Sequence, residues 1–358
     1  MVFLHFSGFR ALSFFFFLSL ILQSDALPRR GRKRPNNNTG AATGATVGAA
    51  AGITAGLAAT GGGTVSQATD GSTILDKTVN INGLAIRYKI SAPASLFTTA
   101  SGVPGGAATA ATAATANNAT AGQNGLNVLL HGDGGQSFVD FPNQAVQGGL
   151  MGVVVLAPNQ NRFWGGGSGL DRTDGVAHSA AVNTLIQEQL PQDVAFDPAN
   201  VFFTGVSGGS LMLSGFFMPA FGAAYKTGVM LNCGALAPQV AVVDAATLAA
   251  STRIHFQSTQ NELASLQPAI PQAVAAYETL AANAGLSAAQ VGALQTVDAS
   301  PVGGHCEFDG QGFVSGIQLM ADSFADVMLA GGSGQVGGIG NVLTTVVGNE
   351  NIKFGTPS

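Results

Sequence analysis

The distribution of apolar and polar residues along the chain predicts strands that alternate with helices. Two runs at residues 74–81 and 84–90 flank Asn82-Gly83, the dipeptide most typical of a two-residue β-hairpin turn. Short apolar runs follow, each of the length of a buried strand. They cover residues 126–130, 152–156, 201–204, 228–231 and 253–257.

Between and after these runs, apolar residues recur at the spacing of one face of a helix. Such stripes cover residues 182–190, 270–281 and 313–327, and Gly285 follows the second stripe. A leading antiparallel hairpin followed by alternating strands and helices predicts an α/β fold. Its sheet would be mostly parallel, with helices on both faces.

The N-terminal part of the chain differs from this alternating region. Residues 1–26 hold a short apolar core after Arg10 and then small residues, which is typical of a secretory signal peptide. This core is too short for a stable membrane span, and an uncleaved anchor is the alternative. Residues 27–72 begin with a basic cluster, typical of a processing site or of a cationic segment after the signal. They continue as an Ala/Gly/Thr-rich linker that we expect to be disordered.

The predicted globular domain therefore covers residues 73–330. An Ala/Thr-rich tract at residues 99–124 is interpreted as a surface insertion, and residues 331–358 as a Gly-rich tail without a lipid-attachment signal. Asn37 in the linker and Asn118 in the insertion each lie in an acceptor sequence for N-glycosylation.

Composition indicates an extracellular location and argues against one class of partner. Charged residues make up only 9% of the chain, which suits a secreted protein. Six of the 14 basic and one of the 19 acidic residues precede residue 35, so the remaining 8 basic and 18 acidic residues give a net charge of −10. Nothing there resembles a basic stripe, so nucleic-acid binding is not expected. Cys233 and Cys306 are the two cysteines, and in an oxidising compartment they are expected to pair, with separate buried thiols as the alternative.

The candidate nucleophile is Ser207, in the sequence Gly205-Val206-Ser207-Gly208-Gly209. This pentapeptide joins an apolar strand run to an apolar segment of helical character. A serine on so tight a turn has its hydroxyl lifted above the sheet edge, where a base can reach it. Because glycine makes up 50 of the 358 residues, the pentapeptide alone is weak evidence, and the interpretation depends on its context.

The candidate base is His305, which follows Gly303-Gly304 in a loop before the last helical stripe. A serine nucleophile needs such a base within reach. His255 lies in the middle of a strand run and is interpreted as a packed neutral imidazole, while His178 lies in the segment of the first helical stripe. A loop histidine without function is the alternative for His305.

The candidate oxyanion loop is His131-Gly132-Asp133-Gly134-Gly135, directly after a strand run. Its glycines let the backbone fold tightly and aim N–H groups toward the space above Ser207. With the N–H of Gly208, the N–H of Asp133 or Gly134 would bind the negative oxygen of a tetrahedral intermediate. A plain glycine turn is the alternative.

The order of these motifs resembles the α/β-hydrolases over residues 73–330. Within that family the chain is most similar to secreted fungal esterases of the polyhydroxybutyrate-depolymerase and feruloyl-esterase type, through His131-Gly-Asp-Gly-Gly, Arg162-Phe-Trp164 and His305-Cys306. The resemblance implies an α/β-hydrolase fold, with Ser207 as nucleophile and His305 as base. It implies no organic cofactor, and no cysteine or histidine cluster has the spacing of metal ligands.

The third member of the triad is where the chain departs from the family. Its expected place follows the seventh strand, and many relatives have Asp where this chain has Asn261. An asparagine can orient an imidazole but carries no charge to stabilise imidazolium. Glu262 is therefore assigned the role of the acid, with Asn261 and Asp298 as alternatives.

Two further features lie near the predicted site. Cys306 adjoins the base, and a bond to Cys233, which follows the sixth strand, would hold the base loop beside the sheet. Trp164 lies on a Gly-rich loop and, with His131, is assigned to substrate binding, although a hydrophobic plug over the sheet is the equal alternative for Trp164. Residues 171–174 (Asp-Arg-Thr-Asp) are interpreted as loop pairing and a helix N-cap.

The sequence therefore predicts a secreted serine hydrolase, extracellular or associated with the cell wall. It would cleave small-molecule or polymer-linked carboxylic esters through an acyl-enzyme, without a stable membrane anchor. One alternative is a catalytically inactive α/β-hydrolase scaffold that acts as a binding or wall-associated protein. The other is a low-complexity wall protein in which the motifs are coincidental.

Overall fold

The computed structural model describes most of the chain beyond the N-terminal segment. The described residues are 57–59, 62–68, 71–108, 122–140, 146–340, 342 and 344–357. The predicted signal peptide, the basic cluster, and the glycosylation sites at Asn37 and Asn118 lie outside them, as do most of the predicted linker and the middle of the predicted insertion. Within these described residues, no helix is long and apolar enough to cross a membrane.

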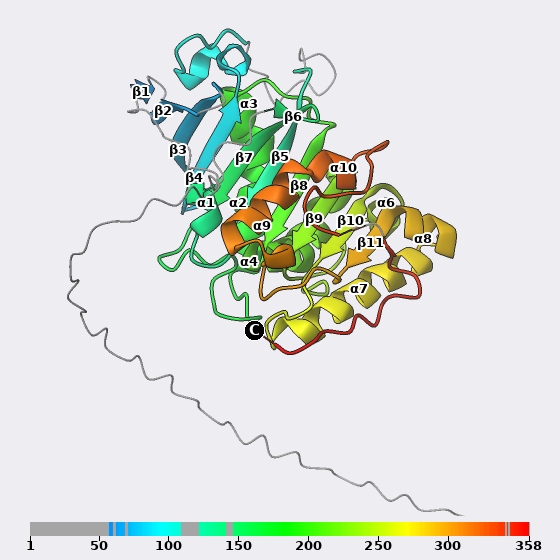
Figure 1. Ribbon diagram of the computed structural model, residues 1–358. Helices are drawn as coiled ribbons and strands as arrows, with labels where there is room; N and C mark the ends of the chain where they lie inside the picture. The colour runs from blue at the N-terminus through cyan, green and yellow to red at the C-terminus, as the bar shows by residue number, and fades with distance from the viewer. Residues whose placement is uncertain are drawn as a thin grey trace, which may run out of the picture. The chain divides into compact units, whose positions relative to one another are not determined.

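A single mixed sheet forms the centre of the described domain (Figure 1). Its strands are β1 (Leu57–Ala59), β2 (Gly63–Gln67), β3 (Thr73–Ile81), β4 (Leu84–Ala92), β5 (Gly125–Leu130), β6 (Val146–Gln147), β7 (Leu150–Leu156), β8 (Val201–Val206), β9 (Gly228–Asn232), β10 (Arg253–Gln257), β11 (Gln295–Asp298) and β12 (Thr344–Thr345). They lie in the order β1-β2-β3-β4-β7-β5-β8-β9-β10-β11-β12, with β6 beside β7.

The six neighbouring strands from β7 to β11 are parallel, whereas β1 to β4 and β12 pair antiparallel. The order β3-β4-β7-β5-β8-β9-β10-β11 is that of the α/β-hydrolase fold, so the predicted fold class is confirmed. In such a sheet the loops after the parallel strands meet at one edge, where ligand sites usually lie.

Helices cover both faces of the sheet. They are α1 (Gln136–Asp140), α2 (Gly175–Thr184), α3 (Leu190–Asp193), α4 (Gly208–Met212), α5 (Met218–Tyr225), α6 (Ala245–Ser251), α7 (Leu266–Asn283), α8 (Ala288–Leu294), α9 (Phe313–Asp322) and α10 (Phe324–Met328), with π-helical turns η3 (Leu185–Gln189) and η4 (Leu213–Phe217) and the 3₁₀ turns η1 (Ala94–Leu96), η2 (Thr99–Ser101) and η5 (Phe308–Gly310). The turn η4 joins α4 and α5 into one continuous helix behind Ser207.

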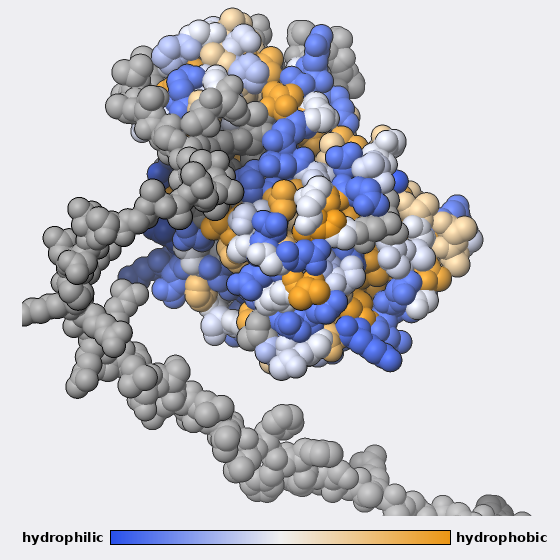
Figure 2. All heavy atoms as spheres, in the orientation of Figure 1, coloured by the Kyte–Doolittle hydropathy of each residue, from blue (hydrophilic) through white to orange (hydrophobic). Residues whose placement is uncertain are grey.

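The alternation of side chains along β9 shows how the core divides. Val229 and Leu231 pack in the larger apolar cluster with α2, α4 and α7. Met230 points to the other face, into a cluster with α9 and α10. A central strand buried on both faces needs a continuous apolar run, which is the pattern that predicted it. At the surface, Figure 2 shows hydrophobic residues scattered among hydrophilic ones on the face in view.

The sheet extends beyond both predicted domain boundaries. Strand β2 lies inside the predicted linker and pairs with β3 of the domain. Strand β12 lies inside the predicted tail and pairs with β11. The tail also buries Val336 and Val346, and the Gly355 N–H donates to the carbonyl of Gln260 at 2.6 Å. At the start of the predicted insertion, Val103 is buried in the core. Backbone pairing and a few apolar anchors are enough to join these Gly- and Thr-rich segments to the domain.

Candidate active site

Ser207 lies on a sharp turn between β8 and α4. Its backbone has φ 48° and ψ −113°, a conformation that residues with a side chain rarely adopt. The neighbours must be glycine, because a Cβ on Gly205 would lie 2.6 Å from the Cα of Ser210. A Cβ on Gly209 would lie 2.0 Å from the carbonyl oxygen of Leu130. The turn therefore holds the Ser207 hydroxyl at the edge where the parallel strands end.

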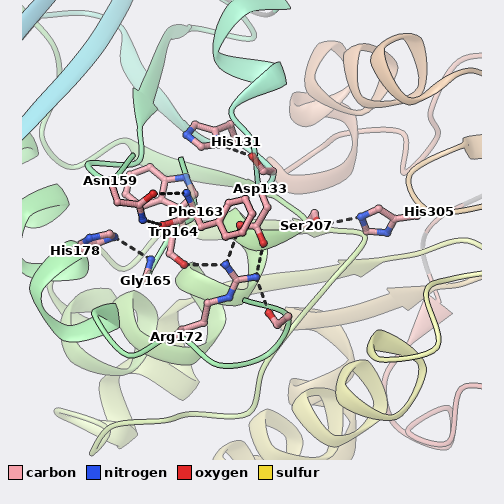
Figure 3. A network of polar contacts seen from close by, with 12 residues as sticks. His131, Asp133, Asn159, Phe163, Trp164, Gly165, Arg172, His178, Ser207 and His305 are labelled. Carbon is pink, nitrogen blue, oxygen red and sulfur yellow. Dashed lines mark hydrogen bonds and ion pairs between the residues drawn. The ribbon is translucent and has the colours of Figure 1, made fainter. Parts of the chain in front are cut away.

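The imidazole of His305 meets this hydroxyl. Its Nε2 lies 2.9 Å from Oγ of Ser207, although 98 positions separate the two residues in the sequence (Figure 3). His305 lies in the loop between β11 and α9, and its side chain is 19% exposed. With Nε2 unprotonated, the hydroxyl donates to the ring, which is the arrangement a general base requires.

Glu262 contacts the other side of the same ring. The Nδ1 of His305 donates to Oε1 of Glu262, and the Glu262 side chain is fully buried. The carboxylate also accepts hydrogen bonds from the N–H of Leu263 at 2.8 Å and from the hydroxyl of Ser258 at 3.2 Å. These three donors compensate for the burial of a charged group and fix its orientation.

The two alternative acids have other contacts. The carboxylate of Asp298 accepts from Nε2 of Gln257 at 3.1 Å and from the N–H of Ser300 at 2.8 Å. Asn261 donates its backbone N–H to the carbonyl of Gly303 at 3.1 Å. Of the three predicted candidates, Glu262 is the one that reaches Nδ1 of His305.

The loop from His131 to Gly135 lies directly against the start of α4. A Cβ on Gly132 would lie 3.4 Å from the Cβ of Ser207. Two of the loop's N–H groups already have acceptors. Gly134 donates to the carbonyl of Arg162, in the loop after β7, at 3.1 Å, and Gly135 donates to the carbonyl of Gly132 at 3.0 Å. The prediction that Gly134 could serve as an oxyanion donor is therefore corrected, since its N–H is already used.

The other two predicted oxyanion donors have no acceptor in the described part of the chain. The N–H of Asp133 has no acceptor in the described part of the chain. The N–H of Gly208 belongs to the first turn of α4, where no earlier helical carbonyl can accept it. Of the three predicted oxyanion donors, Asp133 and Gly208 are therefore the two whose N–H groups have no acceptor among the described residues.

The side chain of Asp133 takes part in a separate interaction, shown in Figure 3. Its two carboxylate oxygens accept from the two terminal nitrogens of Arg172, at 2.8 Å each. The same guanidinium donates to the carbonyl oxygens of Trp164 at 2.9 Å and of Gly169 at 2.7 Å, and the Arg172 side chain is only 2% exposed. Sequence reasoning placed the pairing of Arg172 within its own loop, because nothing local connects it to a residue 39 positions earlier.

His131 and Trp164 are both completely buried, so the predicted roles in substrate binding do not fit this structure. The Nε2 of His131 accepts the N–H of Ala157 at 2.9 Å, and burial lowers the pKa of His131 to about 4. Trp164 packs between His131 and His178, with ring centroids 5.5 and 6.1 Å apart. Trp164 therefore matches the alternative interpretation, a buried hydrophobic side chain that packs its own loop against the sheet.

The loop that carries His305 is joined to the sheet by a disulfide. Cys233, directly after β9, is bonded to Cys306, as proposed from their positions in the sequence. Cys233 also donates its N–H to the carbonyl of Gln257 at 2.8 Å. The Sγ of Cys306 lies 3.9 Å from Nε2 of His305, so the disulfide holds in place the residue next to His305.

The candidate site is therefore assembled from loops that follow four parallel strands. Strand β5 precedes the Asp133 loop, β8 precedes Ser207, β10 precedes Glu262 and β11 precedes His305. Among the described residues, no group of three or more His, Cys, Asp or Glu side chains could hold a metal ion. The arrangement combines a hydroxyl, an imidazole, a buried carboxylate and two N–H donors without an acceptor among the described residues, all at one edge of the sheet.

The similarity of this chain to known proteins is distant. No model of a known protein family matches the chain, and no curated protein matches its sequence. Among solved structures, the chain is similar to a phospholipase/carboxylesterase from Dyadobacter fermentans, with 14% identity over 57% of this chain and 90% of that one and a TM-score of 0.38. It is also similar to a ferulic acid esterase, with 12% identity over 70% and 96% of the two chains and a TM-score of 0.38.

A third similar structure is a puromycin-hydrolysing peptidase from Mycobacterium tuberculosis, with 9% identity, 79% of this chain covered and a TM-score of 0.39. The match spans 48% of that peptidase. These identities and TM-scores are too low to transfer an activity to this chain. What its own strand order and loop positions establish is an α/β-hydrolase fold.

Proposed function

We propose that the protein is a serine hydrolase that cleaves carboxylic esters through an acyl-enzyme intermediate. The observation that carries this proposal is the continuous series of contacts from Ser207 Oγ to His305 Nε2 at 2.9 Å, and from His305 Nδ1 to buried Glu262. A nucleophile, its base and an orienting carboxylate in this relation are the recognised parts of a catalytic triad on any fold.

In the first half of the reaction, Oγ of Ser207 attacks the ester carbonyl carbon while Nε2 of His305 takes its proton. The carbonyl oxygen becomes negative, and the N–H groups of Gly208 and Asp133 bind it. The bond from the carbonyl carbon to the alcohol oxygen then breaks, and His305 returns the proton to that oxygen. Glu262 stabilises the imidazolium that forms between these two proton transfers.

In the second half, His305 removes a proton from a water molecule, which attacks the acyl carbon. The bond to Ser207 breaks, the proton returns to Oγ, and the carboxylic acid leaves. Both halves use the same base and the same oxyanion donors, which is why one site can perform both.

The proposal includes an extracellular location and an ester substrate that is either a small molecule or linked to a polymer. The disulfide between Cys233 and Cys306 supports an oxidising compartment, where such bonds persist. The signal-like N-terminus and the low charge of the chain support the same location. The alternative is an inactive scaffold of the same fold that acts as a binding protein.

A labelling experiment separates the two. We expect a fluorophosphonate probe to label the purified secreted protein, and expect Ser207→Ala to lose the label while keeping the circular dichroism spectrum of the wild type. A panel of p-nitrophenyl esters with acyl chains of increasing length, together with aryl esters, would define the acyl preference. On the best ester, Ser207→Ala should lower kcat/KM by about 10⁴ or more. A folded wild type that neither takes the label nor cleaves any ester of the panel would favour the inactive scaffold.

A further inference from the structure

We propose that Arg172 is a positioning residue of the oxyanion site, a role that rests on the proposed function. It would act through Asp133 and contact neither the substrate nor the reacting atoms. By holding the Asp133 carboxylate, it fixes the backbone N–H of Asp133 and neutralises a negative charge that would otherwise oppose the oxyanion.

The geometry connects this ion pair to the reacting centre. A Cβ on Gly208 would lie 2.1 Å from Oδ1 of Asp133, so the carboxylate rests directly on the backbone of the residue that supplies the second donor. Figure 3 shows Asp133 between Arg172 and Ser207. A movement of the Asp133 side chain would therefore disturb both proposed donors together.

The guanidinium is itself held from several directions. Besides the two bonds to Asp133, it donates to the carbonyl oxygens of Trp164 and Gly169. Trp164 is in turn packed against His131, the first residue of the oxyanion loop. The planar guanidinium of Arg172 makes two parallel hydrogen bonds and so sets both the distance and the angle of the Asp133 carboxylate. A lysine ammonium, which acts as a point charge, would not set the angle.

The charge of Asp133 makes this neutralisation necessary. A carboxylate beside a developing oxyanion raises the energy of the tetrahedral intermediate, because like charges repel strongly in a poorly solvated site. The Asp133 side chain is 25% exposed and that of Arg172 is 2% exposed, so water alone would compensate this carboxylate only in part. Loss of Arg172 would thus impair the transition state more than the bound substrate.

The chain contains a matched control for this pair. Arg87 on β4 also binds a carboxylate with two nitrogens, that of Asp76 on β3, at 2.9 and 2.7 Å. That pair lies in the leading antiparallel hairpin, and its arginine side chain is 48% exposed. Besides binding Asp76, the guanidinium lies 5.2 Å from the ring centroid of Phe138 in α1, which is not one of the candidate site residues. Arg87→Met removes the same kind of interaction where no oxyanion is stabilised.

The test measures kcat and KM on the best p-nitrophenyl ester for Arg172→Met, for Asp133→Asn with Arg172→Met, and for Arg87→Met. A burst titration gives the fraction of working sites, and thermal melts check folding. We expect Arg172→Met to lower kcat about 30- to 100-fold with KM changed by less than about threefold, since oxyanion donors act only in the transition state. Arg87→Met should keep kcat within about twofold of the wild type.

The double variant decides between charge and simple bracing. Removing the Asp133 charge as well should restore kcat by at least about threefold over Arg172→Met, because the uncompensated carboxylate is gone. A residue that only braced the loop would leave the double variant no better than the single one. If Arg172→Met does not fold, Arg172→Lys takes its place, with kcat expected about 3- to 10-fold below the wild type at unchanged KM.

An active wild type whose folded Arg172 variants keep full kcat would overturn this inference alone. A double variant no better than Arg172→Met would overturn the neutralisation and leave to Arg172 only the fixing of the Asp133 N–H. A wild type without esterase activity would overturn the proposed function and the inference with it.

Discussion

Two loops flank Ser207, and different forces hold them. The loop that carries His305 is joined covalently to the end of β9 through Cys233 and Cys306, and its imidazole rests on the buried Glu262. The loop that carries Asp133 has no covalent tie. It is held by the ion pair with Arg172 and by hydrogen bonds such as that from the Ala157 N–H to His131.

The difference follows from what each loop must hold. In the proposed reaction, the base loop positions a ring that changes its charge twice in each half-reaction, so its support must not depend on the state of that ring. The oxyanion loop would position neutral N–H donors that never ionise, so an ion pair and hydrogen bonds can hold it without a covalent tie. The two sides should therefore respond to different perturbations: the base side to removal of a carboxylate or a disulfide, the oxyanion side to protonation.

The largest effect is expected on the base side, from Glu262→Gln. The amide keeps the shape of the side chain but carries no charge to stabilise imidazolium, so kcat should fall by about 10³ to 10⁴. Steady-state kinetics on a p-nitrophenyl ester measure the loss. Asn261→Ala serves as the control and should keep kcat within a few-fold. A large loss in Asn261→Ala with little change in Glu262→Gln would transfer the acid role to Asn261.

The second effect concerns the covalent tie. Replacing Cys233 and Cys306 together by alanine should lower the free energy of unfolding by about 4 kcal/mol, given that the two cysteines are 73 positions apart in the sequence. Urea denaturation measures the loss. Activity should fall as well in the variant that stays folded, since the loop of His305 would no longer be held at β9. Unchanged kcat in a measurably destabilised variant would show that the disulfide serves stability alone.

The smallest of the three effects lies on the oxyanion side and depends on pH. Burial lowers the pKa of His131 to about 4, below the value of 6.5 expected in the unfolded chain. A histidine with a depressed folded pKa contributes stability above the unfolded value, and this contribution is lost as the pH falls toward the folded value. As the pH falls from 6.5 to 4, protonation of His131 in the unfolded chain should therefore lower the free energy of unfolding by about 3 kcal/mol.

Urea denaturation at several pH values measures this slope, and His131→Asn provides the comparison. Burial lowers the pKa of His178 and His255 as well, so the wild-type slope combines several histidines. The variant should show a shallower decline between pH 6.5 and 4 because its side chain at that position does not titrate. An equal slope in both proteins would mean that His131 is not held neutral by its burial.

Much of the fold was predictable because its central strands are buried on both faces. The apolar runs matched β5, β7, β8, β9 and β10 within a few residues, and the Asn82-Gly83 turn placed β3 and β4. Strand β11 was not predicted, since Gln295–Asp298 holds a single large apolar residue. The outer strands β2 and β12 are defined by backbone pairing, and with Val65 as their single large apolar residue they leave no periodic signal.

The helices show the same limit. The stripe at residues 313–327 predicted one helix, but Ser323 adopts a non-helical conformation that separates α9 from α10. The short helices α6 and α8 were not predicted, because seven residues each provide too few turns for a recurring apolar face.

At the site, local glycine patterns pointed to Ser207 and His305, whose catalytic roles remain predictions. The partnership of Asp133 with Arg172 could not be read from the sequence, because it joins two loops that only the fold brings together. The burial of Trp164 and the use of the Gly134 N–H likewise depend on neighbours from other loops. Such features follow from the assembled sheet edge and leave no local pattern.

The Gly355 N–H, bonded to the carbonyl of Gln260, places the last residues of the chain beside the loop that carries Glu262. A purification handle or a solid support attached after Gly355 would therefore emerge on the same side as Ser207. Immobilised in that way, the protein would turn the edge of the sheet that carries the candidate site toward the resin. An attachment point on the opposite side, where the parallel strands begin, would leave that edge open.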